Sequence, residues 1–253
     1  MRRMSAGPVL LVTGGSRGIG AAVCVAAAKA GWRVAVNYAT NRDAADAVVG
    51  AIVAAGGSAI AVQGDVGSEA DIQAMFAAVD AAFGRLDGLV NNAGIVGPTA
   101  RIDEMSVDRL ERMFRINIIG SIRCAAEAVR RMSTRYGGKG GAIVNISSAA
   151  AVLGSPAQYV DYAASKGAID TFTIGLAREV ATEGIRVNAI RPGVIDTEIH
   201  ASGGLPDRAR DLAPTIPVQR PGTAEEVADA VLYLLSDKAT YVTGAILNVS
   251  GGR

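Results

Sequence analysis

Tyr162 and Lys166 are the two residues whose types and spacing most directly suggest chemistry. They lie four positions apart in a stretch with helical character, so their side chains share one face of the helix. A phenol has a pKa of about 10, too high for easy proton exchange near neutrality, but a nearby ammonium stabilises the phenolate. Tyr162 is therefore a candidate general acid and base, although such a pair taken alone is more often a packing feature. Tyr159 has no such partner, because Ala163 stands four positions later.

A glycine-rich turn, TGGSRGIG at residues 13–20, follows the first predicted strand and leads directly into a helix. Glycines let the backbone turn sharply and let a pyrophosphate approach the amides, and the helix N-terminus adds free N–H groups. Gly20 also allows the helix to lie close to the strand. The alternative is a tight turn that binds nothing. The predicted phosphate-binding residues are Gly14, Ser16, Arg17, Gly18, Ile19 and Gly20.

The elements that must position these residues alternate between short β-branched runs and longer alanine-rich runs, which is typical of parallel βαβ units. The predicted strands cover residues 9–12, 33–38, 59–63, 88–90, 142–146, 186–190 and 245–249. The predicted helices cover residues 18–30, 42–55, 69–83, 107–135, 159–182 and 224–235. We therefore expect one α/β domain over residues 1–253, a Rossmann-type doubly wound sheet of seven parallel strands flanked by helices on both faces.

Residues 192–222 interrupt this alternation with five prolines and little periodicity. A connection of that length inside a compact domain is usually a binding loop, so we predict a substrate lid. The alternative is a disordered surface excursion. His200, the only histidine, falls in this segment, and a single histidine without a positioned serine and acid does not argue for a hydrolase.

Composition excludes several classes of partner. The 25 basic and 24 acidic residues nearly balance, so no overall charge favours nucleic acid or an anionic membrane. The arginines within residues 123–135 alternate with apolar residues, which favours a solvated helix face over a phosphate-binding patch. Cys24 and Cys124 lie far apart without Cys or His neighbours, so we predict no metal site. Without a recognisable signal peptide or an apolar run of bilayer length, we expect a cytoplasmic protein.

The spacing of the turn, TGxxxGxG, differs from the GxGxxG of most dinucleotide folds. Together with four later segments, it resembles the classical short-chain dehydrogenases/reductases over nearly the whole chain. These segments are Asp65-Val66, Asn91-Asn92-Ala93-Gly94, Ser147-Ser148 with Tyr162-x-x-x-Lys166, and Pro192-Gly193. The resemblance is strongest to 3-oxoacyl-carrier-protein reductases and sugar or polyol dehydrogenases. It implies an oxidoreductase that moves a hydride between NAD(P)(H) and a carbonyl or secondary alcohol, via a Tyr/Lys/Ser/Asn site.

The same resemblance implies further cofactor contacts. Asp65 and Val66 would line the adenine pocket, and Lys166 would hold the nicotinamide ribose hydroxyls next to Tyr162. The remaining implied contacts follow the fourth strand and the sixth, beside the nicotinamide: Asn91, Ala93, Gly94, Pro192, Gly193, Ile195 and Thr197.

Two further catalytic residues follow from the resemblance. Ser148 would donate a hydrogen bond to the substrate oxygen and steady its developing negative charge. It lies fourteen positions before Tyr162, one more than the family's commonest spacing, and Ser147 lies further still, so we prefer Ser148. Asn117 matches the fourth catalytic position, which the family associates with a helix irregularity and a proton-relaying water. Its alternative role is a polar residue satisfied within a helix.

The end of the second strand bears on the choice of cofactor. A carboxylate there would accept hydrogen bonds from the ribose 2′-hydroxyl and repel a 2′-phosphate. This chain instead continues from Asn37 and Tyr38, which we expect to contact the cofactor here, without a carboxylate until Asp43. Arg17 stands inside the glycine turn. A guanidinium can bind phosphate bidentately, so we predict NADP(H) over NAD(H), unless Arg17 and Arg42 are ordinary surface charges.

Two other functions remain as alternatives: a non-catalytic dinucleotide-binding sensor or scaffold, and an epimerase or dehydratase on an extended form of the fold. The second usually needs a longer substrate domain than the chain after Gly193 allows. By resemblance we expect a homotetramer that packs through residues 107–135 and 159–182 about one axis, and through the last helix and strand about another. The substrate is expected to be a small carbonyl or alcohol compound, and nothing selects among acyl, sugar and steroid compounds.

Overall fold

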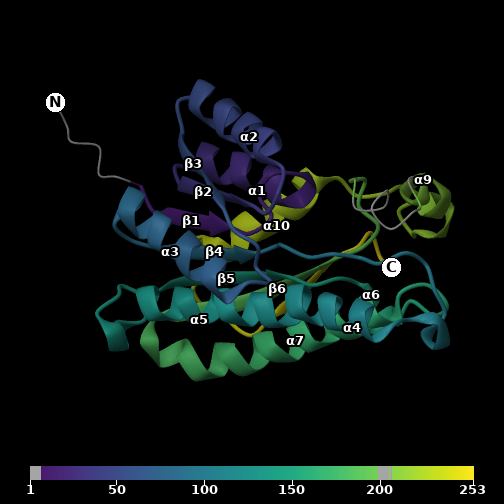
Figure 1. Cartoon of the computed structure of the whole chain (residues 1–253). Coiled ribbons are helices and arrows are strands. Elements are labelled where there is room, and N and C mark those ends of the chain that lie inside the picture. The colour runs from purple at the N-terminus through teal and green to yellow at the C-terminus, as the bar shows by residue number, and fades with distance from the viewer. Residues whose placement is uncertain (1–6, 199–204, 206) are drawn as a thin grey trace.

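Seven parallel strands form one sheet in the computed structural model, which describes residues 7–198, 205 and 207–253 (Figure 1). The strand order is β3-β2-β1-β4-β5-β6-β7, and every neighbouring pair is parallel. The strands are β1 Val9–Val12, β2 Arg33–Tyr38, β3 Ser58–Gln63, β4 Gly88–Asn91, β5 Gly141–Ile146, β6 Ile185–Pro192 and β7 Ile246–Val249. The predicted doubly wound sheet is confirmed. Its order reverses between β1 and β4, where open α/β sheets bind their ligands.

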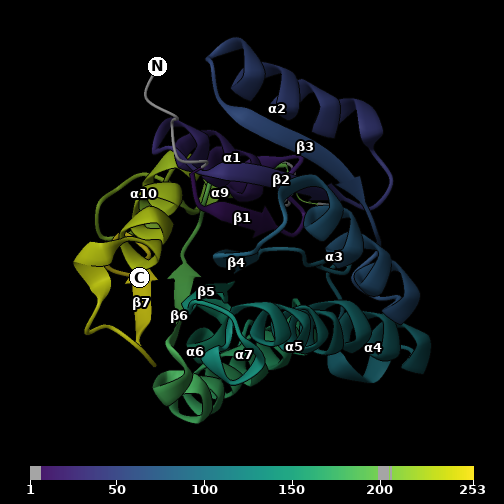
Figure 2. The same ribbon diagram turned by 90° about the vertical axis from the view of Figure 1, so that its left-hand side faces the viewer.

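Helices cover both faces of the sheet (Figures 1 and 2). They are α1 Gly18–Lys29, α2 Arg42–Ala54, α3 Glu69–Phe83, α4 Val107–Phe114, α5 Ser121–Met132, α6 Ala150–Leu153, α7 Val160–Val180, α9 Arg208–Leu212 and α10 Ala224–Leu235. Helices α1, α2 and α10 bury their apolar sides against one face, and α3, α5 and α7 against the other. Cys24 lies in the first of these cores and Cys124 in the second, where burial raises the pKa of both thiols.

The strands are almost continuously apolar because both of their faces are covered. All four residues of β1 are completely buried, and their side chains divide between the two cores. Gly84 ends α3 in the left-handed conformation with φ of 71°, and Gly31 and Gly56 have similar positive φ values after α1 and α2. These three glycines therefore end their helices as their positions in the sequence predict.

The single helix predicted over residues 107–135 is wrong in one respect. Helix α4 gives way to a π-helical segment at Arg115–Gly120 before α5 begins, and α5 ends at Met132. Gly120 lies so close to the backbone of Val66 that a side chain would begin 2.6 Å from the Val66 oxygen. The helix was predicted from a 3.6-residue periodicity of apolar residues. That periodicity does not reveal a local change of helical pitch or a close contact with another segment.

The segment after β6 folds back onto the sheet where the structure describes it. Ile195 and Gly222 form a bridge, and Val194, Ala209 and Ile216 pack into a small apolar cluster. Helix α9 lies within this segment and was not predicted, because proline and glycine obscure its short pattern. The described part is therefore ordered, and His200 lies outside the described residues.

Within residues 7–198 and 207–253, no helix combines the length and the apolar character that crossing a bilayer requires.

Candidate active site

Two asparagine side chains support the glycine turn at residues 13–20 through hydrogen bonds. Asn37, at the end of β2, accepts a hydrogen bond from Gly14 N–H at 3.0 Å through Oδ1. Its Nδ2 donates to the carbonyls of Val62 and Gly64 at 3.2 and 2.9 Å. Asn92 donates through Nδ2 to the carbonyls of Thr13 and Gly14 at 3.0 and 2.9 Å. The turn is therefore fixed in shape by the protein itself.

The geometry of the turn fits a bound pyrophosphate. Gly14 and Gly18 have positive φ of 61° and 50°, and a side chain at Gly20 would begin 2.3 Å from the Gly14 oxygen. Helix α1 starts at Gly18, and its N-cap, Arg17, makes no side-chain capping bond. The first N–H groups of α1 are therefore not capped by the residue that precedes them, as an anion site at a helix N-terminus requires.

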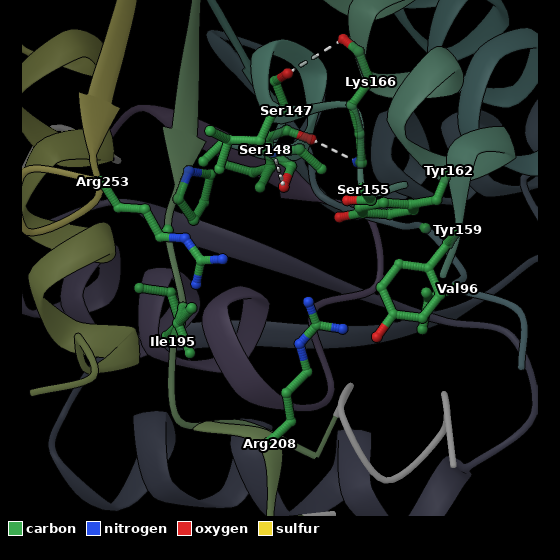
Figure 3. Close-up of a pocket in the computed structure, with 18 of the residues that line it drawn as sticks. Val96, Ser147, Ser148, Ser155, Tyr159, Tyr162, Lys166, Ile195, Arg208 and Arg253 are labelled. Carbon is green, nitrogen blue, oxygen red and sulfur yellow. Dashed lines mark hydrogen bonds between the residues drawn. The ribbon is translucent and has the colours of Figure 1, made fainter. Parts of the chain in front are cut away.

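A cavity of about 470 Å³ opens at the carboxyl ends of the strands (Figure 3). Ser148, Tyr162 and Lys166 line it, together with Ile19 from the start of α1 and Pro192 from the end of β6. The predicted catalytic residues of β5 and α7 thus face the same space as part of the predicted cofactor site. Gly94, Gly193, Ile195 and Thr197 of the predicted cofactor set also line this cavity.

The two serines after β5 have different surroundings. Ser147 is buried and donates its hydroxyl to the backbone oxygen of Lys166 at 3.2 Å. The half-buried Ser148 accepts from Ala150 N–H at 3.1 Å and also hydrogen-bonds Tyr162. Ser148 therefore lies where the preferred serine should lie, beside the phenol and on the cavity. The loop between Ser148 and Tyr162 contains Ser155 and Ala157, both with positive φ.

Lys166 is buried and donates through Nζ to the Ile146 oxygen at 2.8 Å. Burial lowers its pKa to about 8, opposed by the negative charge of Asp170 one turn further along α7. Burial raises the pKa of Tyr162, and the hydrogen bond with Ser148 works in the opposite direction. In the chain by itself, desolvation thus raises the Tyr162 pKa more than the Ser148 hydrogen bond lowers it. The net shift is opposite to the lowering that the sequence led us to expect. The Nζ of Lys166 lies 5.6 Å from the centre of the Tyr162 ring.

Asn117 lies in the π-helical segment, so the helix irregularity that the resemblance implies is present. Its Oδ1 accepts from Ile95 N–H at 2.8 Å, and its Nδ2 donates to the Ile95 oxygen at 3.0 Å and to Ser165 Oγ at 3.1 Å. A side chain at Gly94 would begin 3.3 Å from Asn117 Oδ1 and 3.5 Å from Lys166 Nζ. Glycine at position 94 therefore keeps a space open next to both groups.

The other predicted cofactor residues divide into exposed and buried groups. Arg17 and Asp65 are exposed, and Ser16 and Ala93 are partly so. Asn37, Tyr38, Val66 and Asn91 are buried, and the Asn91 amide donates to Ser121 and Asn145. The buried side chains hold the backbone around the predicted cofactor contacts.

The residues of the cavity wall that sequence reasoning did not find include Tyr159, Arg208 and Arg253. Tyr159 immediately precedes α7, and its ring meets that of Tyr162 edge-on at 6.5 Å between centroids. Arg208 lies on α9, the helix that was not predicted, and Arg253 follows β7. Their contribution depends on the exact path of the segment after β6 and of the chain after β7, which the sequence did not predict.

Comparisons with known proteins match this chain over nearly its whole length. Residues 14–253 match the family model described as enoyl-(acyl carrier protein) reductase. The uncharacterized oxidoreductase YgfF of Escherichia coli is 52% identical over 97% of this chain and 99% of its own. A 3-oxoacyl-[acyl-carrier-protein] reductase of Synechocystis is 40% identical over 96% of each chain. The solved short-chain dehydrogenase/reductase of Serratia marcescens superposes with a TM-score of 0.89 at 37% identity, covering 97% of each chain.

With this fold, this turn and these relatives, the chain belongs to the classical short-chain dehydrogenase/reductase family of oxidoreductases, which use a nicotinamide dinucleotide.

Proposed function

We propose that the chain is a cytosolic reductase or dehydrogenase that transfers a hydride between NADP(H) and a carbonyl or secondary alcohol. The observation that carries this proposal is the convergence of Ser148, Tyr162 and Lys166 on one cavity that also reaches the glycine turn through Ile19. When bound, the cofactor supplies or accepts the hydride. The chain's own residues would bind the substrate oxygen, orient the carbonyl and move the proton.

In the direction of reduction, Ser148 and Tyr162 would both donate hydrogen bonds to the substrate oxygen. Tyr162 would release its proton to that oxygen as negative charge develops there. Lys166, charged below its pKa of about 8, would stabilise the phenolate that remains, and Asn117 would complete the path for the proton that restores Tyr162. Oxidation of an alcohol would use the same groups in reverse.

The preference for NADP(H) rests on Arg17. Its guanidinium is exposed at the turn, and none of the ion pairs of the described residues includes it, whereas Arg42 pairs with Asp46 at 3.2 Å. No Asp or Glu occupies residues 37–42 to repel a 2′-phosphate.

The test compares NADPH with NADH by nicotinamide fluorescence on the wild type, Arg17→Ala and the matched control Arg42→Ala. We expect Arg17→Ala to weaken NADPH binding roughly tenfold and to leave NADH nearly unchanged, with Arg42→Ala close to the wild type. Tighter binding of NADH by the wild type would overturn the choice of NADP(H). Failure of both dinucleotides to bind at micromolar concentrations would overturn the oxidoreductase proposal.

We also infer a homotetramer. Large apolar side chains are exposed where the resemblance places the two interfaces: Ile119 is 51% exposed beside α5, Tyr233 on α10 is 44% exposed and Leu247 on β7 is 39% exposed. Light scattering of the purified chain should give four times the chain mass, and Leu247→Glu should reduce it to a dimer. A wild-type monomer would contradict the inference.

A further inference from the structure

Two guanidinium groups point into the cavity from outside the Ser148, Tyr162 and Lys166 group (Figure 3). Arg208 reaches it from α9, and Arg253 from the chain beyond β7. They approach from two segments far apart in the sequence, and both side chains end in the same space (Figure 3).

Neither guanidinium has an anionic partner in the part of the chain that the structure describes. None of the ion pairs there includes Arg208 or Arg253. In contrast, Arg210 on the same helix pairs with Asp207 at 2.8 Å, and the half-buried Arg109 pairs with Asp161 at 2.8 Å. Arg208 is half-buried, so an anion beside its partly desolvated guanidinium would be favourable, whereas Arg253 is exposed and can reach such an anion from the solvent side.

No carboxylate side chain lines the described wall of the cavity to fill this role. None of the described residues that line the cavity is Asp or Glu. Residues 199–204 and 206, which adjoin α9 in the sequence, read IHASGG and P and therefore contain no acid either. Lys166 adds a third positive charge to the wall. The cavity thus presents cations to any compound that enters it, and no side chain on its described wall carries a negative charge.

The surroundings of Arg208 strengthen this effect and fix its position. Its guanidinium lies over the ring of Tyr159, 4.9 Å from the centroid, and that ring contacts Tyr162. Leu153 and Leu212 contribute apolar surface to the same wall. Burial lowers the pKa of Arg208, and the charge of Arg253 lowers it further, so the two cations are close enough to repel each other. An anion between them would relieve that repulsion.

We propose that Arg208 and Arg253 form an anion subsite, so that the preferred substrate is a small carbonyl compound that carries a carboxylate or a phosphate group. This inference rests on the proposed function, because it assigns the substrate class of the same cavity. A guanidinium binds either anion through paired N–H donors. The anion would lie on the lid side of the cavity while the carbonyl faces Ser148 and Tyr162.

The first experiment measures kcat/KM with NADPH for pairs made of an anion and its neutral counterpart. The carboxylate pairs are 3-oxobutanoate, 4-oxopentanoate and 5-oxohexanoate, each against its methyl ester, which also vary the distance between carbonyl and anion. The phosphate pair is dihydroxyacetone phosphate against dihydroxyacetone. The enzymes are the wild type, Arg208→Ala, Arg253→Ala and the control Arg210→Ala, which changes an exposed arginine of the same helix.

We expect the wild type to prefer at least one anion over its neutral partner by about tenfold or more. Arg208→Ala and Arg253→Ala should reduce this preference to less than about threefold while leaving the neutral compounds unchanged, and Arg210→Ala should retain it. The pair that responds identifies carboxylate or phosphate as the natural group. An anion preference that survives both substitutions would overturn the subsite. Weaker NADPH binding in both variants, with the preference intact, would assign the arginines to the cofactor instead.

A second measurement does not depend on turnover. Glutarate, dimethyl glutarate and inorganic phosphate are titrated by calorimetry into the wild type and Arg208→Ala, each saturated with NADPH. Binding of glutarate or phosphate that is lost in Arg208→Ala supports the subsite, and no binding of either anion to the wild type overturns it. Anion binding without reduction of any carbonyl would leave the subsite in place and count against the proposed reductase activity.

Discussion

The two ends of the active-site groove are stabilised in different ways. At the cofactor end, side-chain amides hold the turn at residues 13–20, and Asn37 makes hydrogen bonds to Gly14, Val62 and Gly64. At the substrate end, the described part of the segment after β6 rests on a small cluster of Val194, Ala209 and Ile216. It is also held by main-chain hydrogen bonds, such as Gly222 N–H to the Val194 oxygen at 2.9 Å. Buried side-chain amides that join several segments thus fix the first end, whereas main-chain bonds and a small apolar cluster hold the second.

This difference matches the demands of the two ligands. A phosphate site needs N–H groups in fixed directions, because hydrogen bonds weaken steeply with misalignment. A segment that packs on a cluster of only three buried residues is less stable locally than the core, and it can differ in sequence without disturbing the turn. Tyr162 and Lys166 stand at the boundary, on a long helix that belongs to neither end. The comparison predicts that substitutions at the two ends affect different measurements.

The largest effect is expected from Tyr162→Phe, which removes the proton donor at the boundary and nothing from either end. The reduction rate should fall by roughly 10²- to 10⁴-fold, while NADPH binding by fluorescence stays within about threefold. Tyr159→Phe is the matched control and should keep most of the rate. A Tyr162→Phe enzyme with more than about a tenth of wild-type activity would show that the phenol does not transfer the proton, and would favour the sensor alternative.

Asn37→Ala should damage the cofactor end specifically. It leaves the partly buried Gly14 N–H and the carbonyls of Val62 and Gly64 without this partner, at about 1–3 kcal/mol each. We expect a loss of several kcal/mol in urea unfolding and weaker binding of NADPH and NADH alike. Asn41→Ala, which removes only the exposed N-cap of α2, should cost about 1 kcal/mol and leave cofactor binding unchanged. Equal effects of the two substitutions would refute the bracing role of Asn37.

Lys166 gives a prediction about pH. Burial lowers the Lys166 pKa from 10.5 to about 8. Between about pH 8 and pH 10.5 the unfolded chain therefore binds this proton more tightly than the folded chain does. Stability should therefore rise as the pH increases from about 8 to 10.5, by up to roughly 3 kcal/mol, because the cost of the buried ammonium disappears. Comparing Lys166→Met with the wild type by urea unfolding at pH 7 and pH 9.5 isolates this gain. A stability difference between the two proteins that does not change with pH would contradict it. The reduction rate of the wild type should decline above pH 8.

The smallest effect concerns the loop at the substrate end. Ala157 is exposed with φ of 56°, a conformation that costs a residue with a side chain about 1–2 kcal/mol but suits glycine. Ala157→Gly should therefore raise stability by about 0.5–1 kcal/mol. Ala77→Gly, at an exposed position inside α3, should lower it by a similar amount. If both substitutions destabilise the protein equally, Ala157 is not strained.

Much of the fold was predictable because its signals are local. The strands read as apolar runs bounded by turn residues, so all seven were found to within two residues. The helical periodicity did not show the π-helical segment around Asn117, which only the family resemblance implied, and helix α9 was missed. The first keeps the same apolar pattern as an ordinary helix, and the second is too short to show one.

The sequence alone determined the sheet, the glycine turn and the Tyr162–Lys166 pair, since each depends on residues close together in the chain. Only the tertiary structure decided that Asn37 supports the turn from behind, and that Arg208 and Arg253 face one cavity without a carboxylate. The physical reason is that burial and charge pairing arise between distant segments. Whether an arginine is neutralised or left to bind a ligand depends on what the fold places beside it.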